Sequence, residues 1–269
     1  MIGASRNSLA LVQESMRSRS SQGDLSALSA ELLAAADILA NEKSLRQNLA
    51  DSGQPVSVRT SLIKDVFGKK VSASTQEVLG ELAAARWSSG EDLVDAAELL
   101  GSQAAFVAAD KAGSLDRVEN ELFHFGRAVQ ASSELQMTLT DPALSSIAKA
   151  AIVGDLLGSK VDAITLDLIK YVAGHLRGRR VDSVLATLGN LAAAQRNQVV
   201  AEVRSVVALD AEQTRKLSAA LSKLTGKDVR INVAIDPSVL GGIAVTIGEE
   251  VIDGSISARL ESARRTLLA

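Results

Sequence analysis

The sequence contains no cysteine, only two histidines and few aromatic residues, which make up 2% of its 269 positions. Without cysteine there can be no disulfide and no thiolate metal site. The histidines, His124 and His175, lie far apart, and neither stands in a spacing such as HExxH that would support metal binding or catalysis. One tryptophan and one tyrosine offer no stacking platform for nucleic acid. We therefore expect no catalytic residues, no metal site and no cofactor.

The sequence also lacks a basic region and a long apolar run. Its formal net charge is −3, with acidic and basic residues interspersed, which argues against nucleic acid as a partner. No apolar stretch approaches the roughly 18 to 20 residues needed to cross a bilayer. The first 23 residues are rich in serine and arginine, as in a transit peptide, but Glu14 and the spacing of Leu9, Val12 and Met16 favour an amphipathic helix.

What the sequence does contain is an internal repeat built from alanine, leucine and valine. Shifted by about 90 residues, it matches itself without a gap. The segment LRQNLAD at 45–51 falls on LQMTLTD at 135–141, and DVFGKKV at 65–71 falls on DLLGSKV at 155–161. This pattern predicts one supersecondary unit used twice.

Each copy is expected to consist of short amphipathic helices. Apolar stripes with helical spacing occur in both copies, at Leu28, Leu32, Ala35 and Leu39 and at Val118, Leu122, Phe125 and Val129. Loops are predicted around Pro55, Gly68, Pro142 and Gly158, with Pro142 as a first helical residue. We place the first helical unit at 1–108 and the second at 109–198, with a seam helix at about 91–110 that the two copies share.

From residue 199 the hydrophobic period changes to strand-like alternation, so 199–269 is predicted to be a small α/β domain. Its helix should begin at Asp210 and stop at Gly226, with Leu217, Leu221 and Leu224 on one face. A last helix should turn four apolar residues inward, namely Ile256, Leu260, Ala263 and Leu267. The predicted fold class is mainly α: two related helical-bundle units followed by a small C-terminal β-α-β-β-α domain.

Two glycine-containing segments superficially resemble phosphate-binding loops. Gly241 and Gly242 precede a strand rather than a helix, so a structural role is favoured. GDLLGSKV at 154–161 has the wrong glycine spacing, and its lysine follows the serine. Its counterpart at 65–71 keeps only the second glycine, which favours a helix end in both copies.

Other polar or aromatic residues have a simple structural interpretation. Trp87 and Tyr171 fall near equivalent places in the two copies and are expected to be packing residues. The cluster of Arg177, Arg179 and Arg180 could bind an acidic partner, although a solvated turn is the default interpretation.

The C-terminal segment GGIAVTIGEEVIDGSISARLESARRTLL, 241–268, closely resembles the signature of the delta subunit of F-type ATP synthase, the oligomycin-sensitivity-conferring protein family. Besides the alternating apolar strand, the matching residues are Gly241, Gly242, Gly248, Asp253, Gly254, Ser255, Arg259 and Leu260, which we interpret as structural. The resemblance covers most of the chain from about residue 100 and, more weakly, the first copy.

The resemblance implies a non-catalytic subunit of the peripheral stalk, which resists rotor torque during proton-driven ATP synthesis. In this family the helical bundle grips the N-terminal helix of an alpha subunit, and the C-terminal domain holds the b subunit. The implied location is the cytoplasmic face of the bacterial plasma membrane, reached only through the complex.

The repeat departs from the family's single helical bundle and leaves open which copy grips alpha. The second copy is closer to the family pattern, whereas the first keeps an opening helix at 5–16 that resembles the family's first helix. The alternative function is a helical-repeat adaptor unrelated to ATP synthase. An enzyme ranks third, because no residue set for catalysis can be assigned.

Overall fold

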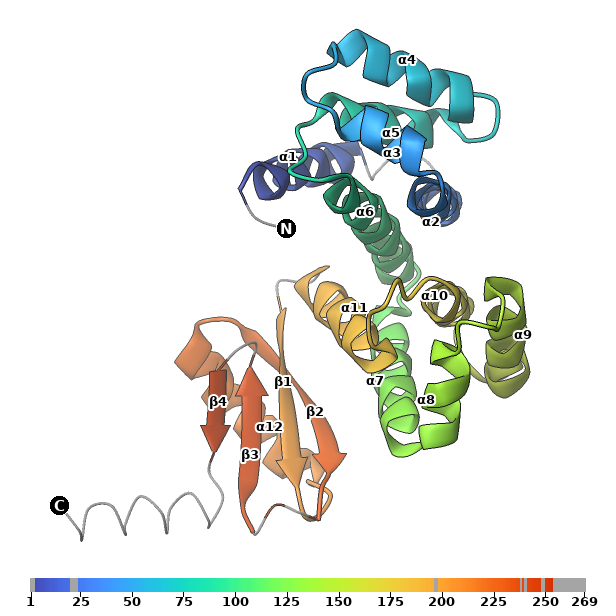
Figure 1. The fold of residues 1–269 in the computed structure, drawn as a ribbon. Coiled ribbons are helices and arrows are strands. Elements are labelled where there is room, and N and C mark those ends of the chain that lie inside the picture. The colour runs from blue at the N-terminus through green and yellow to red at the C-terminus, as the bar shows by residue number, and fades with distance from the viewer. Residues whose placement is uncertain are drawn as a thin grey trace, which may run out of the picture. The chain divides into compact units, whose positions relative to one another are not determined.

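A computed structural model describes residues 3–19, 24–195, 198–237, 239, 241–247 and 250–253. The chain divides into two compact units, Met1–Leu188 and Gly189–Ala269, each of which is described by itself. The first is helical, and the second contains a small sheet (Figure 1). The predicted fold class is confirmed as far as the described residues extend. The boundary predicted between the two helical copies stays a prediction.

The helices of the first unit repeat at a constant interval of 90 residues. Four helices of the first copy have counterparts whose first and last residues both lie 90 positions later. They are α2 (Leu25–Asn41), α3 (Lys43–Ala50), α4 (Val56–Phe67) and α5 (Ala73–Ala84), matched by α7 (Leu115–Ala131), α8 (Ser133–Thr140), α9 (Ser146–Leu157) and α10 (Ala163–Gly174). A short 3₁₀ turn, Gly158–Lys160, follows α9. The gapless sequence match therefore corresponds to a repeated set of helices.

Helix α6 (Gly90–Lys111) belongs to both copies. Shifting α1 (Ala4–Arg19) by 90 residues places it inside α6, while α6 shifted likewise falls on α11 (Val181–Gln195). In agreement, α6 contacts α1, α2, α3 and α5 of the first copy and α7 and α10 of the second. No linker separates the copies, because one helix is the last of the first copy and the first of the second.

The apolar stripes predicted from the sequence form the helical core. All eight stripe residues are buried, as are Val12 and Met16 of α1. Burying a large apolar side chain of this kind contributes roughly 1.5–3 kcal/mol, so these stripes contribute substantially to the packing energy. The amphipathic interpretation of residues 4–19 is thereby confirmed.

A polar anchor is repeated along with the core. Glu31 Oε2 accepts hydrogen bonds from Ser72 N at 2.9 Å, Ser72 Oγ at 2.7 Å and Thr75 Oγ1 at 2.5 Å. In the second copy Glu121 Oε2 accepts from Asp162 N at 2.8 Å and Thr165 Oγ1 at 2.6 Å. Each carboxylate thus binds the N-terminus of α5 or α10, where negative charge is favoured.

The hydrogen bonds of these anchors lower the pKa of both carboxyl groups. Burial alone would raise the pKa of Glu31, but the hydrogen bonds from Thr75 and Ser72 outweigh it and hold that pKa below its ordinary value. The pKa of Glu121 is lowered in the same way against the effect of burial, with Arg117 adding to the lowering. Both groups therefore favour the folded state in their charged form.

One predicted helix start in the second copy is wrong. Pro142 does not begin a helix but lies in the turn before α9. The helix starts at Ser146 because the Ser145 hydroxyl caps it, accepting a hydrogen bond from Ala148 N at 3.2 Å. The helix ends predicted at Gly68 and Gly158 are confirmed, since α4 ends at Phe67 and α9 at Leu157.

In the second unit the described residues form a four-stranded sheet with the order β2-β1-β3-β4. Strand β1 (Gln198–Ser205) pairs parallel with β2 (Asp228–Ile235) and antiparallel with β3 (Ile243–Ile247), which pairs antiparallel with β4 (Glu250–Asp253). Helix α12 (Ala211–Thr225) connects β1 to β2. The predicted β-α-β-β order is confirmed, whereas the final helix predicted after it lies outside the described residues.

The ends of α12 follow the sequence prediction, but one of its three leucines does not. Asp210 and Gln213 form a reciprocal capping box, and Gly226 ends the helix with φ 68°. Leu221 is buried and Leu217 packs against the core, but Leu224 is 69% exposed. Hydrogen bonds joining Ser218 and Ser222 to the backbone of Val229 turn an adjacent face of α12 toward β2, which leaves Leu224 in solvent.

Candidate helix-binding groove

The first helical copy carries an open groove between α1 and α5. The two helices run antiparallel, since Ser8 Oγ donates to the Arg86 carbonyl at 2.7 Å while Ser15 Oγ donates to Glu81 Oε1 at 2.9 Å. The groove encloses about 520 Å³. Its lining residues are Ala4, Asn7, Ser8, Leu11, Val12, Ser15, Glu81, Ala84, Ala85 and Arg86.

The lining suits an apolar helix better than a small substrate. Val12 is buried in the groove, and Leu11 stands at its surface with 74% of its area exposed. Small residues such as Ala84 and Ala85 allow a close approach of another backbone. An amphipathic helix docks on such a surface through apolar anchors spaced one turn apart.

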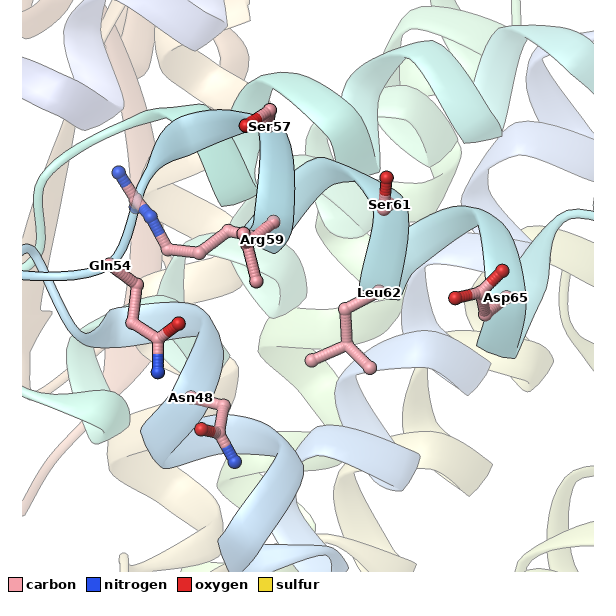
Figure 2. A pocket seen from close by; sticks show the side chains of 8 residues that line it. Asn48, Gln54, Ser57, Arg59, Ser61, Leu62 and Asp65 are labelled. Atoms are coloured by element: carbon pink, nitrogen blue, oxygen red, sulfur yellow. The ribbon is translucent and has the colours of Figure 1, made fainter.

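A second hollow of about 540 Å³ lies over α3 and α4 and is more polar (Figure 2). Asn48, Gln54, Ser61 and Asp65 line it, together with the buried Arg59. The Arg59 guanidinium is committed to the fold, because its Nη1 donates to the Ala85 carbonyl at 2.8 Å. The lining contains no nucleophile paired with a base, so the hollow gives no basis for assigning catalysis.

The two histidines make unrelated contacts. His124 lies edge-on to Phe123, with ring centroids 5.6 Å apart. His175 lies with Nε2 3.0 Å from Asp37 Oδ1 and with Nδ1 2.7 Å from the Tyr171 carbonyl oxygen. No group of three or more metal-ligating side chains occurs within the described ranges. Of these contacts, the one between His175 and Asp37 joins the end of α10 to α2.

The arginine cluster has its acidic partner within the chain, so the solvated-turn interpretation is wrong for two of its members. Arg179 binds Glu98 through two hydrogen bonds of 2.9 Å, and Arg177 Nη2 donates to Glu98 at 2.7 Å and also to Asp95. Glu98 is buried, which makes this charge pairing necessary. The network ties α6 to the loop between α10 and α11.

Comparison with known proteins identifies the family. The family model described as ATP synthase delta (OSCP) subunit matches residues 102–267. The chain belongs to the ATP synthase delta (OSCP) subunit family. Members of this family are peripheral-stalk components of ATP synthase. The alternative of an adaptor unrelated to ATP synthase is therefore excluded.

The similarity to curated relatives extends over the whole chain. The ATP synthase subunit delta of Nocardia farcinica is 40% identical over 99% of this chain and 100% of its own length. The Streptomyces coelicolor subunit delta is also 40% identical, over 99% of this chain and 98% of its own. A chain of the mitochondrial ATP synthase hexamer of Toxoplasma gondii is similar at 24% identity and a TM-score of 0.39, over 62% of this chain and 95% of that one.

The structure describes only part of the C-terminal family motif. Gly241 and Gly242 adopt φ of 72° and 80° directly before β3, a conformation that favours glycine. Asp253 is the last residue of β4. The remaining motif residues, Gly248, Gly254, Ser255, Arg259 and Leu260, lie outside the described residues.

The groove itself was missed by sequence reasoning. Its signal is Leu11, an apolar residue that does not belong to the stripe of Leu9, Val12 and Met16, which packs against the core. A leucine outside the buried stripe of an amphipathic helix marks a second apolar face. Among the described residues no helix is long and apolar enough to be a bilayer span.

Proposed function

We propose that this subunit is a non-catalytic linker of the stator: it joins the catalytic head of ATP synthase to the membrane sector and resists rotor torque. The open apolar groove between α1 and α5 is the observation that supports it most directly. In this proposal the helical part binds the N-terminal helix of an alpha subunit, and the C-terminal domain at 199–269 binds the b subunit. The proposed location of the subunit is the cytoplasmic face of the bacterial plasma membrane, where it is held through the complex.

The energetics of a single groove are moderate. Four to six apolar anchors at roughly 1.5–3 kcal/mol each give a gross gain comparable with the cost of association. A linker held at both ends binds more tightly overall, because the first contact raises the effective concentration of the second partner at its binding surface. Holding against torque therefore requires both partners to be bound at once.

The proposal is tested by pull-down of the full-length chain with purified alpha subunit and, separately, with purified b subunit. We expect both to bind. Failure of the folded wild-type chain to bind either subunit would overturn the linker function.

A further inference from the structure

The groove between α1 and α5 has a counterpart in the second copy, between α6 and α10, but the two differ in exposure. Residues on the open side of the first groove are exposed, and the residues 90 positions later are buried. The three pairs are Ala4 and Val94, Asn7 and Ala97, and Leu11 and Gly101. The repeat thus places the same groove in both copies, and in the second copy something covers it.

Helix α2 covers the second groove. A Cβ atom on Gly101 would lie 2.9 Å from Leu33 Cγ and 3.2 Å from Leu33 N, so α2 sits directly against this position. One turn further along α2, Asp37 Oδ1 lies 3.0 Å from His175 Nε2 at the end of α10. Leu33 is buried, and its spacing from Asp37 puts both residues on one face of α2. Figure 1 shows α2 beside α6.

We propose that α2 is a built-in occupant of the second groove, so that a partner helix docks on the first copy, and that this partner helix presents a small side chain opposite Leu11. The inference rests on the proposed function, in which a helix of alpha binds the helical part. It departs from the position of the family match, which begins at residue 102 and so covers the second copy.

The pairing of side chains across the filled groove explains the requirement for a small residue. In the second copy the groove position is Gly101, and the occupant supplies the bulky Leu33. In the first copy the corresponding position is Leu11, which is 74% exposed and projects from α1. Helices that pack 8 to 10 Å apart fit a large residue against a small one, and two leucines at the closest point would hold them apart. The partner therefore supplies the small member of the pair.

The test measures binding of a fluorescent synthetic peptide, the N-terminal segment of the alpha subunit, to the full-length chain by anisotropy. Leu11→Asp should weaken binding by about 10- to 100-fold, because an apolar anchor is replaced by an unpaired charge. Ile147→Asp is the matched control, since Ile147 is 80% exposed on α9 of the second copy and should leave binding unchanged. Thermal unfolding checks that both variants fold.

A compensating pair tests the small residue. Leucine is substituted, one position at a time, along the peptide, and each peptide variant is tested with the wild-type chain and with the Leu11→Ala variant. At the peptide position that faces Leu11, leucine should weaken binding to the wild-type chain but not to Leu11→Ala. Such recovery reproduces the Gly101–Leu33 arrangement with the sizes exchanged. Absence of any recovery along the peptide would overturn the requirement for a small residue.

The outcomes separate this inference from the function on which it rests. If the wild-type chain binds neither the alpha peptide nor the alpha subunit, the proposed function fails. If the wild type binds and Leu11→Asp binds equally well, the function stands, but the assignment of the groove is overturned.

Discussion

Gly101 is the residue whose substitution most directly tests whether α2 is seated on α6. Alanine at this position would place a methyl group 2.9 Å from Leu33 Cγ and 3.2 Å from a backbone nitrogen, closer than packed atoms allow. Overpacking of this kind costs about 1–3 kcal/mol, while exchanging glycine for alanine inside a helix returns about 1 kcal/mol. The net expectation for Gly101→Ala is a loss of about 0–2 kcal/mol of folding free energy.

Gly80 is the matched control. It lies inside α5 of the same unit, and a Cβ atom there would meet nothing within 4 Å. Gly80→Ala should therefore stabilise the fold by about 1 kcal/mol. The two variants are predicted to differ by about 1–3 kcal/mol in urea unfolding followed by far-UV circular dichroism. Equal stability of the two would refute close packing of α2 on the second groove.

Three further predictions concern the fold. Thr75→Val should cost about 1.5 kcal/mol at pH 7 by removing a hydrogen bond to the charged Glu31. The pKa of Glu31 is lowered in the folded state, so the stabilisation by this anchor is fully present above the ordinary pKa near 4.5 and is lost as the pH falls through the folded pKa. Urea titrations at a series of decreasing pH values should therefore show that the effect of Thr75→Val becomes smaller in acid. Leu221→Ala should cost about 2–4 kcal/mol and Leu224→Ala under about 0.5 kcal/mol, a contrast that thermal unfolding measures. Asp210→Ala should cost about 1 kcal/mol by removing the capping box, and calorimetry that finds no change would contradict the cap.

Much of the helical architecture could be predicted from the sequence because two local signals agree. The 90-residue period fixes equivalent helices, and the apolar stripes fix their buried faces, so the bounds of α2 and α7 correspond residue for residue. Capping is also local, and both ends of α12 follow from Asp210 and Gly226. The helix start predicted at Pro142 was wrong because a stronger cap, Ser145, lies three residues further on.

The candidate site could not be predicted, because it depends on contacts between distant segments. The sequence repeat makes the two copies look equivalent, and nothing local shows that Leu33 packs against Gly101. The arginine cluster was misread for the same reason, since Glu98, its partner, lies about 80 residues earlier in the chain. Periodicity identifies which face of a helix is buried, but the identity of the covering element depends on the tertiary structure.

The asymmetry between the two grooves follows from how the duplication was built. Because α6 serves both copies as one uninterrupted helix of 22 residues, about 33 Å long, the first copy must lie directly on the second. The surface that α6 would otherwise offer to a foreign helix is then the surface on which α2 has to pack. Because α2 of the same chain fills that groove, the two copies have no hinge between them. A movement of one copy relative to the other would have to separate Leu33 from Gly101 and Asp37 from His175. If the subunit transmits load as proposed, it benefits from such a joint, since each flexible segment in series would absorb part of the torque as displacement. In the proposed linker, the second copy therefore extends the rigid part, and the first copy, with its groove open, is the one that binds a partner helix.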